Sequence, residues 1–153
     1  MREILFRGKC TDTGRWYEGQ YIHLHNTTYC FKEDCDRDPD NDIHQIVFEK
    51  MTDWGLPNRH LRADVLPETV GQYTGLKDKN GKKIFEGDIV TISSAAVCMT
   101  GIVEFHDCGF EVREGDTYEC LWYAPEELEI IGNIHDNPDL LRGAEDGNWK
   151  AAD

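Results

Sequence analysis

The chain has 153 residues, of which 39% are hydrophobic, so it is long enough for a sizeable core and too apolar for a disordered protein. Thirty acidic residues against sixteen basic ones give a formal net charge of −14, which disfavours direct nucleic-acid binding because lysine and arginine bind phosphate backbones. The opening MREILFRG lacks the apolar core of a signal peptide, and no apolar stretch is long enough to cross a bilayer. We therefore expect a cytoplasmic protein without membrane contact, whose six cysteines are reduced thiols.

The N-terminal third of the chain has the pattern of β-strands separated by turns. We predict strands at Ile4–Arg7 and Trp16–Leu24, which form a hairpin around the turn sequence TDTG, and a further strand at Ile43–Glu49. The acidic segment Lys32–Asp42 has nothing to bury and is predicted to be a loop. Leu61 and Val65 are spaced by four residues, which predicts a short helix at Asn58–Asp64.

The pattern becomes clearer after residue 70. Asn80-Gly81 predicts a tight type I′ turn, because both residue types tolerate positive φ angles, and Gly87-Asp88 predicts a second corner. The segments DIVTI, GIVEF, GFEVRE and EELEIIGNI then predict four short strands, and the spacing is typical of a small SH3-like barrel. One helical turn is expected from Asn137 to an exit at Gly143.

These elements predict a mainly β fold (β-rich α+β) with little helix, in a single domain over residues 1–153. An N-terminal β-rich lobe with a hairpin and a variable insert is expected at residues 1–69. The SH3-like barrel region toward the C-terminus is expected at residues 70–143, and a frayed tail at residues 144–153.

Four blocks of sequence resemble the YopX family of phage and prophage proteins. They are REILFRG near the start, QYTGLKDKNGKKIFEGDIV at Gln72–Val90, GIVEF at Gly101–Phe105 and EIIGNIHDNPDLL at Glu129–Leu141. The resemblance implies a small, mainly β protein encoded by a phage or prophage in a bacterial host, and one capable of self-association. It implies no activity and no catalytic residues.

Two groups of residues in the N-terminal half have the types that bind metals. The first group is His23, His25, Cys30, Cys35 and His44. A zinc site needs four nitrogen or sulfur ligands, and Cys-x4-Cys lacks the second pair found in zinc ribbons. We expect ordinary surface histidines and thiols here; a zinc site is the alternative.

The second group is a run of aspartates at every second position, Asp34, Asp36, Asp38, Asp40 and Asp42. Taking Asp34, Asp36 or Asp38 as the first ligand never places glycine at the sixth position of a calcium loop, and of these three only the Asp38 register places an acid, Glu49, at the twelfth. We expect a solvated loop, with a weak cation site as the alternative, and hence no metal or cofactor.

No nucleophile–base, phosphate-loop or zinc-protease motif occurs in the sequence, so we expect no enzyme activity. The one basic cluster consists of Lys77, Lys79, Lys82 and Lys83 at a predicted hairpin tip, whereas the segment from Ile84 to Asp153 contains three basic and sixteen acidic residues. These lysines are the candidate contact residues for the acidic half of a second copy.

The sequence therefore predicts an accessory protein that acts by binding or homo-oligomerisation. One alternative is an acidic decoy that occupies the basic groove of a host nucleic-acid-binding protein, so that a basic host protein is a further possible partner. The other alternative is a metal-dependent enzyme built on the histidine and cysteine group or the aspartate run.

Overall fold

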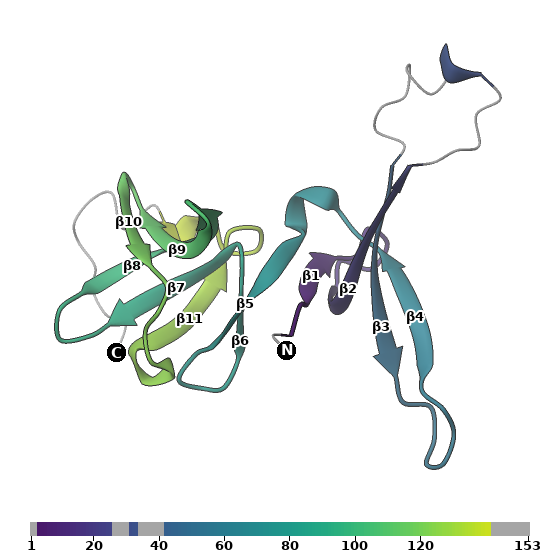
Figure 1. Ribbon diagram of the computed structural model, residues 1–153, viewed down its shortest axis with the longest axis horizontal. Helices are drawn as coiled ribbons and strands as arrows, with labels where there is room; N and C mark the ends of the chain where they lie inside the picture. The colour runs from purple at the N-terminus through teal and green to yellow at the C-terminus, as the bar shows by residue number, and fades with distance from the viewer. Residues whose placement is uncertain (1–2, 26–30, 34–41, 142–153) are drawn as a thin grey trace. The chain divides into compact units, whose positions relative to one another are not determined.

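A computed structural model describes residues 3–25, 31–33 and 42–141. The fold is mainly β, as predicted, and consists of antiparallel strands with short 3₁₀ turns (Figure 1). Contacts within the chain divide it into two compact units, residues 4–70 and residues 1–3 with 71–153. The number of domains stays a prediction.

The N-terminal unit contains four antiparallel strands in the order β4–β3–β2–β1, with β4 at the edge of the sheet. Its elements are β1 (Phe6–Lys9), β2 (Trp16–His25), β3 (Asp42–Lys50), β4 (Arg59–Asp64) and the 3₁₀ turn η1 (Pro67–Thr69). The predicted β1–β2 hairpin is confirmed, with Phe6 opposite Gly19 and Lys9 opposite Trp16. The strand predicted at Ile43–Glu49 is also confirmed and is one residue longer at each end.

The helix predicted at Asn58–Asp64 is wrong, because this segment forms β4. All six residues of β4 pair with β3, from Arg59 opposite Lys50 to Asp64 opposite Gln45. The four-residue spacing of Leu61 and Val65 was a weak helix signal. Pairing with β3 satisfies the backbone along one side of the strand, and this outweighs so short a periodicity.

The C-terminal unit contains a two-stranded hairpin and a five-stranded antiparallel sheet in the order β10–β9–β8–β7–β11. The hairpin consists of β5 (Gly71–Lys77) and β6 (Lys83–Phe85). The sheet consists of β7 (Asp88–Ser93), β8 (Cys98–His106), β9 (Gly109–Glu114), β10 (Thr117–Cys120) and β11 (Leu128–Asn133), and the 3₁₀ turn η2 (Pro125–Glu127) precedes β11. The four predicted strands are confirmed as β7, β8, β9 and β11. The sheet is not the closed barrel that we expected, because β10, which the sequence reading missed, and β11 form its edges.

One hydrophobic cluster forms the core of this unit. Alternate residues of the sheet strands contribute to it, and Ile84 of β6 joins it from the hairpin. Its buried members are Ile84, Val90, Ile92, Met99, Val103, Val112, Leu121 and Leu128. Phe105, near the end of β8, is exposed.

The tight turn with two positive φ angles occurs at a different place from the predicted one. Gly81 has a φ of 77°, but Asn80 does not have a positive φ, so Asn80-Gly81 is not a type I′ turn. Asp107 and Cys108, between β8 and β9, have φ angles of 43° and 70°, which is the type I′ combination. The predicted corner at Gly87 is confirmed by its φ of 83°.

The predicted C-terminal turn begins as expected. Helical residues occur at 139–141, and Leu140 N–H donates to the backbone oxygen of Asn137 over 3.1 Å. The side-chain oxygen of Asn137 accepts a hydrogen bond from Asn133 N–H instead of capping the turn. Gly143 and the predicted tail lie outside the described residues. Within the described ranges, no helix is long and apolar enough to span a lipid bilayer.

Candidate functional site

A polar cluster lies on one face of the β2–β3 ladder. Successive side chains of a strand point to opposite faces, so His23 and His25 share one face of β2, and Asp42 and His44 share one face of β3. The register places His23 directly opposite His44 and His25 directly opposite Asp42. Four side chains that can bind metals or protons are therefore brought together by strand pairing alone.

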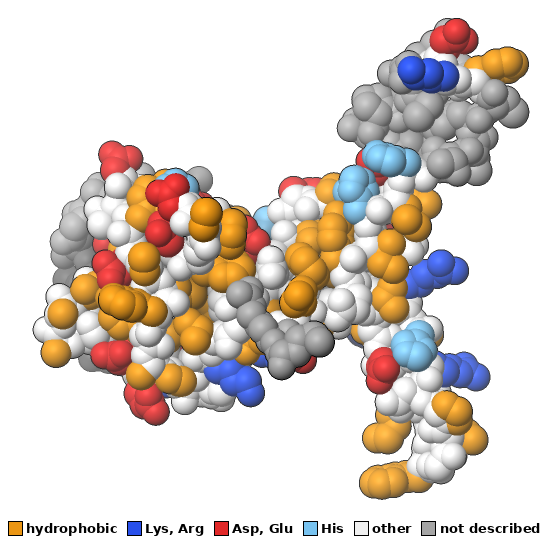
Figure 2. Space-filling view, in the orientation of Figure 1, with side chains coloured by type: hydrophobic (Ala, Val, Ile, Leu, Met, Phe, Trp, Pro, Cys, Tyr) orange, Lys and Arg blue, Asp and Glu red, His pale blue; other side chains and the backbone are white. Residues whose placement is uncertain are grey.

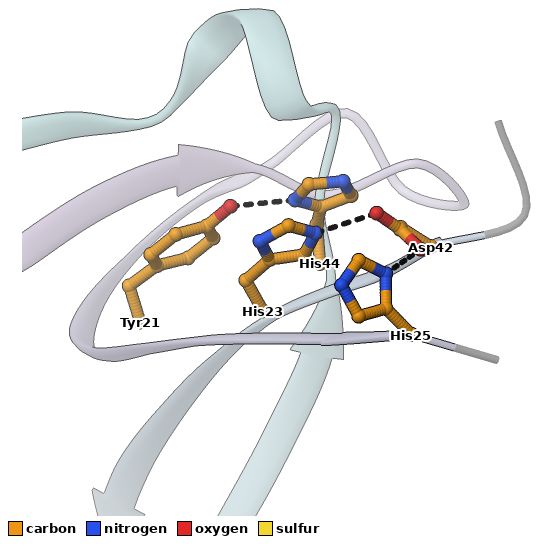
Figure 3. A network of polar contacts seen from close by, with 5 residues as sticks. All are labelled: Tyr21, His23, His25, Asp42 and His44. Carbon is orange, nitrogen blue, oxygen red and sulfur yellow. Dashed lines mark hydrogen bonds and ion pairs between the residues drawn. The ribbon is translucent and has the colours of Figure 1, made fainter. Parts of the chain in front are cut away.

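The contacts within this cluster centre on one carboxylate. Asp42 Oδ2 lies 2.7 Å from His23 Nε2, and its Oδ1 lies 2.7 Å from His25 Nδ1 (Figure 3). The rings of His23 and His44 are stacked, with centroids 4.5 Å apart and planes inclined by 10°. The hydroxyl of Tyr21 contacts Nδ1 of His44, so the network runs continuously from Tyr21 to His25.

The electrostatics follow from these contacts. The hydrogen bonds from His23 and then His25 hold the pKa of the Asp42 carboxyl below its ordinary value, so the charged carboxylate is favoured. Burial raises the pKa of Tyr21, and the negative charge of Asp42 adds to this effect. The cluster thus combines the ionised carboxylate of Asp42 and the neutral phenol of Tyr21, each in contact with imidazole nitrogens.

A cavity of about 480 Å³ borders the cluster. It is open to solvent and lies wholly within the N-terminal unit. Its lining residues are Thr11, Asp42, Ile43, His44, Asp64, Val65 and Pro67. Asp42 and His44 therefore belong both to the polar cluster and to the wall of the cavity, so a small ligand can approach them.

The structure brings together part of the group predicted from the sequence. His23, His25 and His44 meet as described, whereas Cys30 and Cys35 lie outside the described residues, as do Asp34, Asp36, Asp38 and Asp40. Asp42 was assigned to a loop and is instead the central residue of the cluster on β3. Glu49, considered as a twelfth calcium ligand, pairs with His60 over 3.2 Å.

The alternating patterns His-x-His and Asp-x-His were the sequence signals for this site. Each pattern predicts two side chains on one strand face, but the sequence does not give the register that places the two faces opposite each other. Tyr21 follows the same alternation, two residues before His23. It could have been included with the histidines on that ground.

The four candidate lysines lie on the β5–β6 hairpin and differ in their contacts. Lys77 and Lys83 are cross-strand partners. Lys79 forms an ion pair with Glu129 over 2.7 Å, and Lys83 Nζ lies 3.8 Å from a carboxylate oxygen of Glu3. Lys77 and Lys82 have exposed side chains and no ion pair with any other described residue.

A second exposed surface lies on the hairpin formed by β3 and β4, which we call the arm. Its connecting loop carries three exposed hydrophobic side chains, Met51, Trp54 and Leu56, and Trp54 is 91% exposed. Basic residues flank the loop and continue along β4, namely Lys50, Arg59 and Arg62. Figure 2 shows hydrophobic side chains at the end of the arm and basic side chains along its side. Sequence reasoning missed this surface because it assigned all of β4 to a helix.

Comparison with known proteins identifies relatives of this chain. No curated protein matches it. Among solved structures, it is similar to protein EF1440 from Enterococcus faecalis, with 23% sequence identity and a TM-score of 0.46 over 92% of this chain and 99% of that chain. The family model described as YopX protein matches residues 5–142, which is most of the sequence. The chain therefore belongs to the YopX family.

Proposed function

We propose that this protein is a phage- or prophage-encoded binding module that self-associates in the cytoplasm of its bacterial host and has no catalytic role. The observation that supports this proposal is the exposure of Trp54 at the end of the arm. Large aromatic side chains are enriched at the centres of protein interfaces because they bury much apolar surface on contact. With Met51 and Leu56 also exposed, the end of the arm offers an apolar contact surface.

Charge supports a second copy of the same chain as the partner. The arm is basic at Lys50, Arg59 and Arg62, in a protein with a net charge of −14. Residues 84–141 contain thirteen acidic residues and one basic residue, Arg113. Attraction between the arm of one copy and this acidic segment of another favours association and orients the two copies so that the arm faces the acidic segment.

The edge position of β4 provides a further contact surface. Five of its six residues are exposed, and β3 lies on only one side of it. The other side of an edge strand presents backbone N–H and C=O groups that can pair with another chain. Arg59 and Arg62 on this strand oppose pairing with a second β4 by charge repulsion, so a contact with an acidic segment is favoured instead.

Multi-angle light scattering at about 0.1 M salt tests this proposal. The unmodified protein is expected to form dimers or larger assemblies. Trp54→Ala is expected to weaken association by at least about ten-fold, since tryptophans at interface centres contribute most strongly. Trp122→Ala is the matched control, because Trp122 is an exposed tryptophan in the other unit. A monomer throughout the micromolar range, or equal loss from both substitutions, would contradict the proposal.

A further inference from the structure

We propose that His23, Asp42 and His44 bind a divalent transition-metal ion, with a solvent-accessible coordination position that faces the adjoining cavity. This site goes beyond the proposed self-association and does not depend on it. Within the described parts of the chain, these three residues form the one group of three or more potential ligands whose donor atoms all lie close together.

The distances fit a metal centre after small side-chain movements. One potential ligand atom from each residue lies within 4.8 Å of the other two, and His23 Nε2 lies 2.7 Å from Asp42 Oδ2. In a tetrahedral zinc site with bonds of about 2.0–2.1 Å, ligand atoms are about 3.3 Å apart. The His23–Asp42 separation is shorter than this value and no separation exceeds 4.8 Å, so each donor pair needs a change of about 1.5 Å or less to reach it.

The backbone already holds the ligands in place. His23 and His44 are directly opposite each other, and Asp42 lies two residues before His44 on the same face of β3. Ile46, further along this face, is completely buried and anchors β3 in the unit. Ligands on paired strands are held more precisely than ligands on loops, and less entropy is lost when an ion binds.

Other histidine–carboxylate pairs in the protein show what the cluster adds. His60 contacts Glu49 over 3.2 Å, and His106 contacts Glu111 over 3.3 Å. His106 Nδ1 also lies 3.6 Å from a carboxylate oxygen of Asp107, but each of these two groups contains a single imidazole. The β2–β3 cluster instead places two stacked imidazoles beside one carboxylate, which is the donor set that first-row transition metals prefer.

The residues around the three ligands suit a metal site as well. His25 contacts the second oxygen of Asp42, and Tyr21 contacts one ring nitrogen of His44. Contacts of this kind orient metal ligands and are a regular feature of metal sites. Three protein ligands leave at least one position for water or a small ligand. Asp42 and His44 also line the cavity, which provides the space for it.

Calorimetric titration of Zn²⁺ into the full chain, previously treated with a chelator, tests the site. One ion per chain is expected to bind. His44→Ala and the nearly isosteric Asp42→Asn are each expected to weaken binding by at least ten-fold. The control is His60→Ala, which removes an imidazole from a pair on the adjoining β3–β4 ladder and is expected to bind Zn²⁺ as the unmodified protein does. No binding, or equal weakening in the control, would overturn the proposal.

Two further measurements make the titration specific. Cysteine thiolates are also zinc ligands in general, so Co²⁺ is used in parallel. Spectra without a thiolate-to-cobalt charge-transfer band are expected, and a strong band would place the ion on cysteine and overturn the assignment. Circular dichroism of each variant without metal separates lost ligands from lost folding. The site would also be overturned if the Asp42→Asn variant had the circular dichroism spectrum of the unmodified protein and bound Zn²⁺ with unchanged affinity.

Discussion

The side-chain carboxylate of Asp78 accepts a hydrogen bond from the backbone N–H of Ile130, 3.4 Å away, and so connects the β5–β6 loop to strand β11. The same carboxylate accepts hydrogen bonds from the backbone N–H groups of Asn80 and Lys82, each over 2.9 Å. Asp78 is 2% exposed. A buried carboxylate, together with the positive φ of Gly81, therefore determines the shape of this loop.

Asp78→Asn is expected to destabilise the protein by about 1–3 kcal/mol, because its amide NH₂ replaces one of two acceptor oxygens and leaves buried donors without a partner. Urea denaturation measures this change in the free energy of unfolding. Asp116→Asn, at an exposed turn between β9 and β10, makes the same chemical change without such contacts and is expected to have little effect. Equal stability of the two variants would contradict this role for Asp78.

The stability of the protein is expected to fall in acid, partly through the same carboxylate. Burial raises the pKa of Asp78, but hydrogen bonds from Lys82, Ile130 and Asn80 outweigh burial and hold the pKa below its ordinary value. The unfolded chain, with an ordinary pKa near about 3.9, then takes up the proton first as the pH falls. The stabilisation by Asp78 is complete above that value and is lost as the pH falls through the lower pKa of the folded state.

The measurement compares the unmodified protein with Asp78→Asn in urea at several pH values between 7 and 3. The difference in their free energies of unfolding is expected to be constant near neutral pH and to shrink below about pH 4. A difference that stays constant over the whole range would show that Asp78 does not contribute through its charge. The hydrogen bonds from Arg113 also lower the pKa of Glu104, so Glu104 contributes to the loss of stability in acid as well. This contribution is the same in both proteins and cancels in the difference.

The sequence predicted the strands better than the contacts between them. Alternating hydrophobic residues located β2, β3, β7, β8 and β9 to within a few residues, because period-two alternation is a local property. The edge strands β4 and β10 were missed, since exposed strands lack a clear apolar face: Arg59, His60, Leu61 and Arg62 are all exposed. An edge strand depends on its single partner strand, which no local pattern contains.

The same limit applies to the candidate site. Histidine, cysteine and aspartate residues were recognised as possible ligands, but they were grouped by closeness in sequence. The true cluster depends on the β2–β3 register, which places His44 opposite His23 across 21 residues of chain. The turn at Asp107 and Cys108 was not predicted, because cysteine, unlike aspartate, is not a residue type favoured at the positive φ angle that both adopt.

Gly101→Ala is expected to destabilise the sheet by about 1–3 kcal/mol through overpacking. A Cβ atom at Gly101 on β8 would lie 2.3 Å from the backbone oxygen of Arg113 on β9. Backbone atoms in the middle of a sheet cannot move aside as a flexible side chain can. Gly109→Ala is the matched control in the same pair of strands, because a Cβ atom there would meet nothing within 4 Å. Thermal unfolding of both variants measures the effect, and an unchanged midpoint for Gly101→Ala would contradict it.

The lysines of the β5–β6 hairpin have two possible roles, in ion pairs within the chain and in contacts with a second copy, and a charge reversal distinguishes these roles. Lys79 and Lys83 already interact with Glu129 and Glu3, so reversing their charge would disturb intrachain contacts as well as any interface. Lys82 is exposed and has no ion pair among the residues that the structure describes. If the hairpin contacts the acidic segment of a second copy, Lys82→Glu is expected to weaken association about two- to five-fold at 0.1 M salt.

Light scattering across a dilution series measures this effect, with Lys32→Glu as a control that makes the same change in net charge at another exposed lysine. If Lys82 lies in the interface, Lys82→Glu weakens association and Lys32→Glu does not. This difference between the two variants disappears near 1 M salt, where the screening length falls to about 3 Å. A change in net charge without a specific contact affects both variants equally. Equal behaviour would remove the hairpin from the interface and leave the arm around Trp54 as the contact surface.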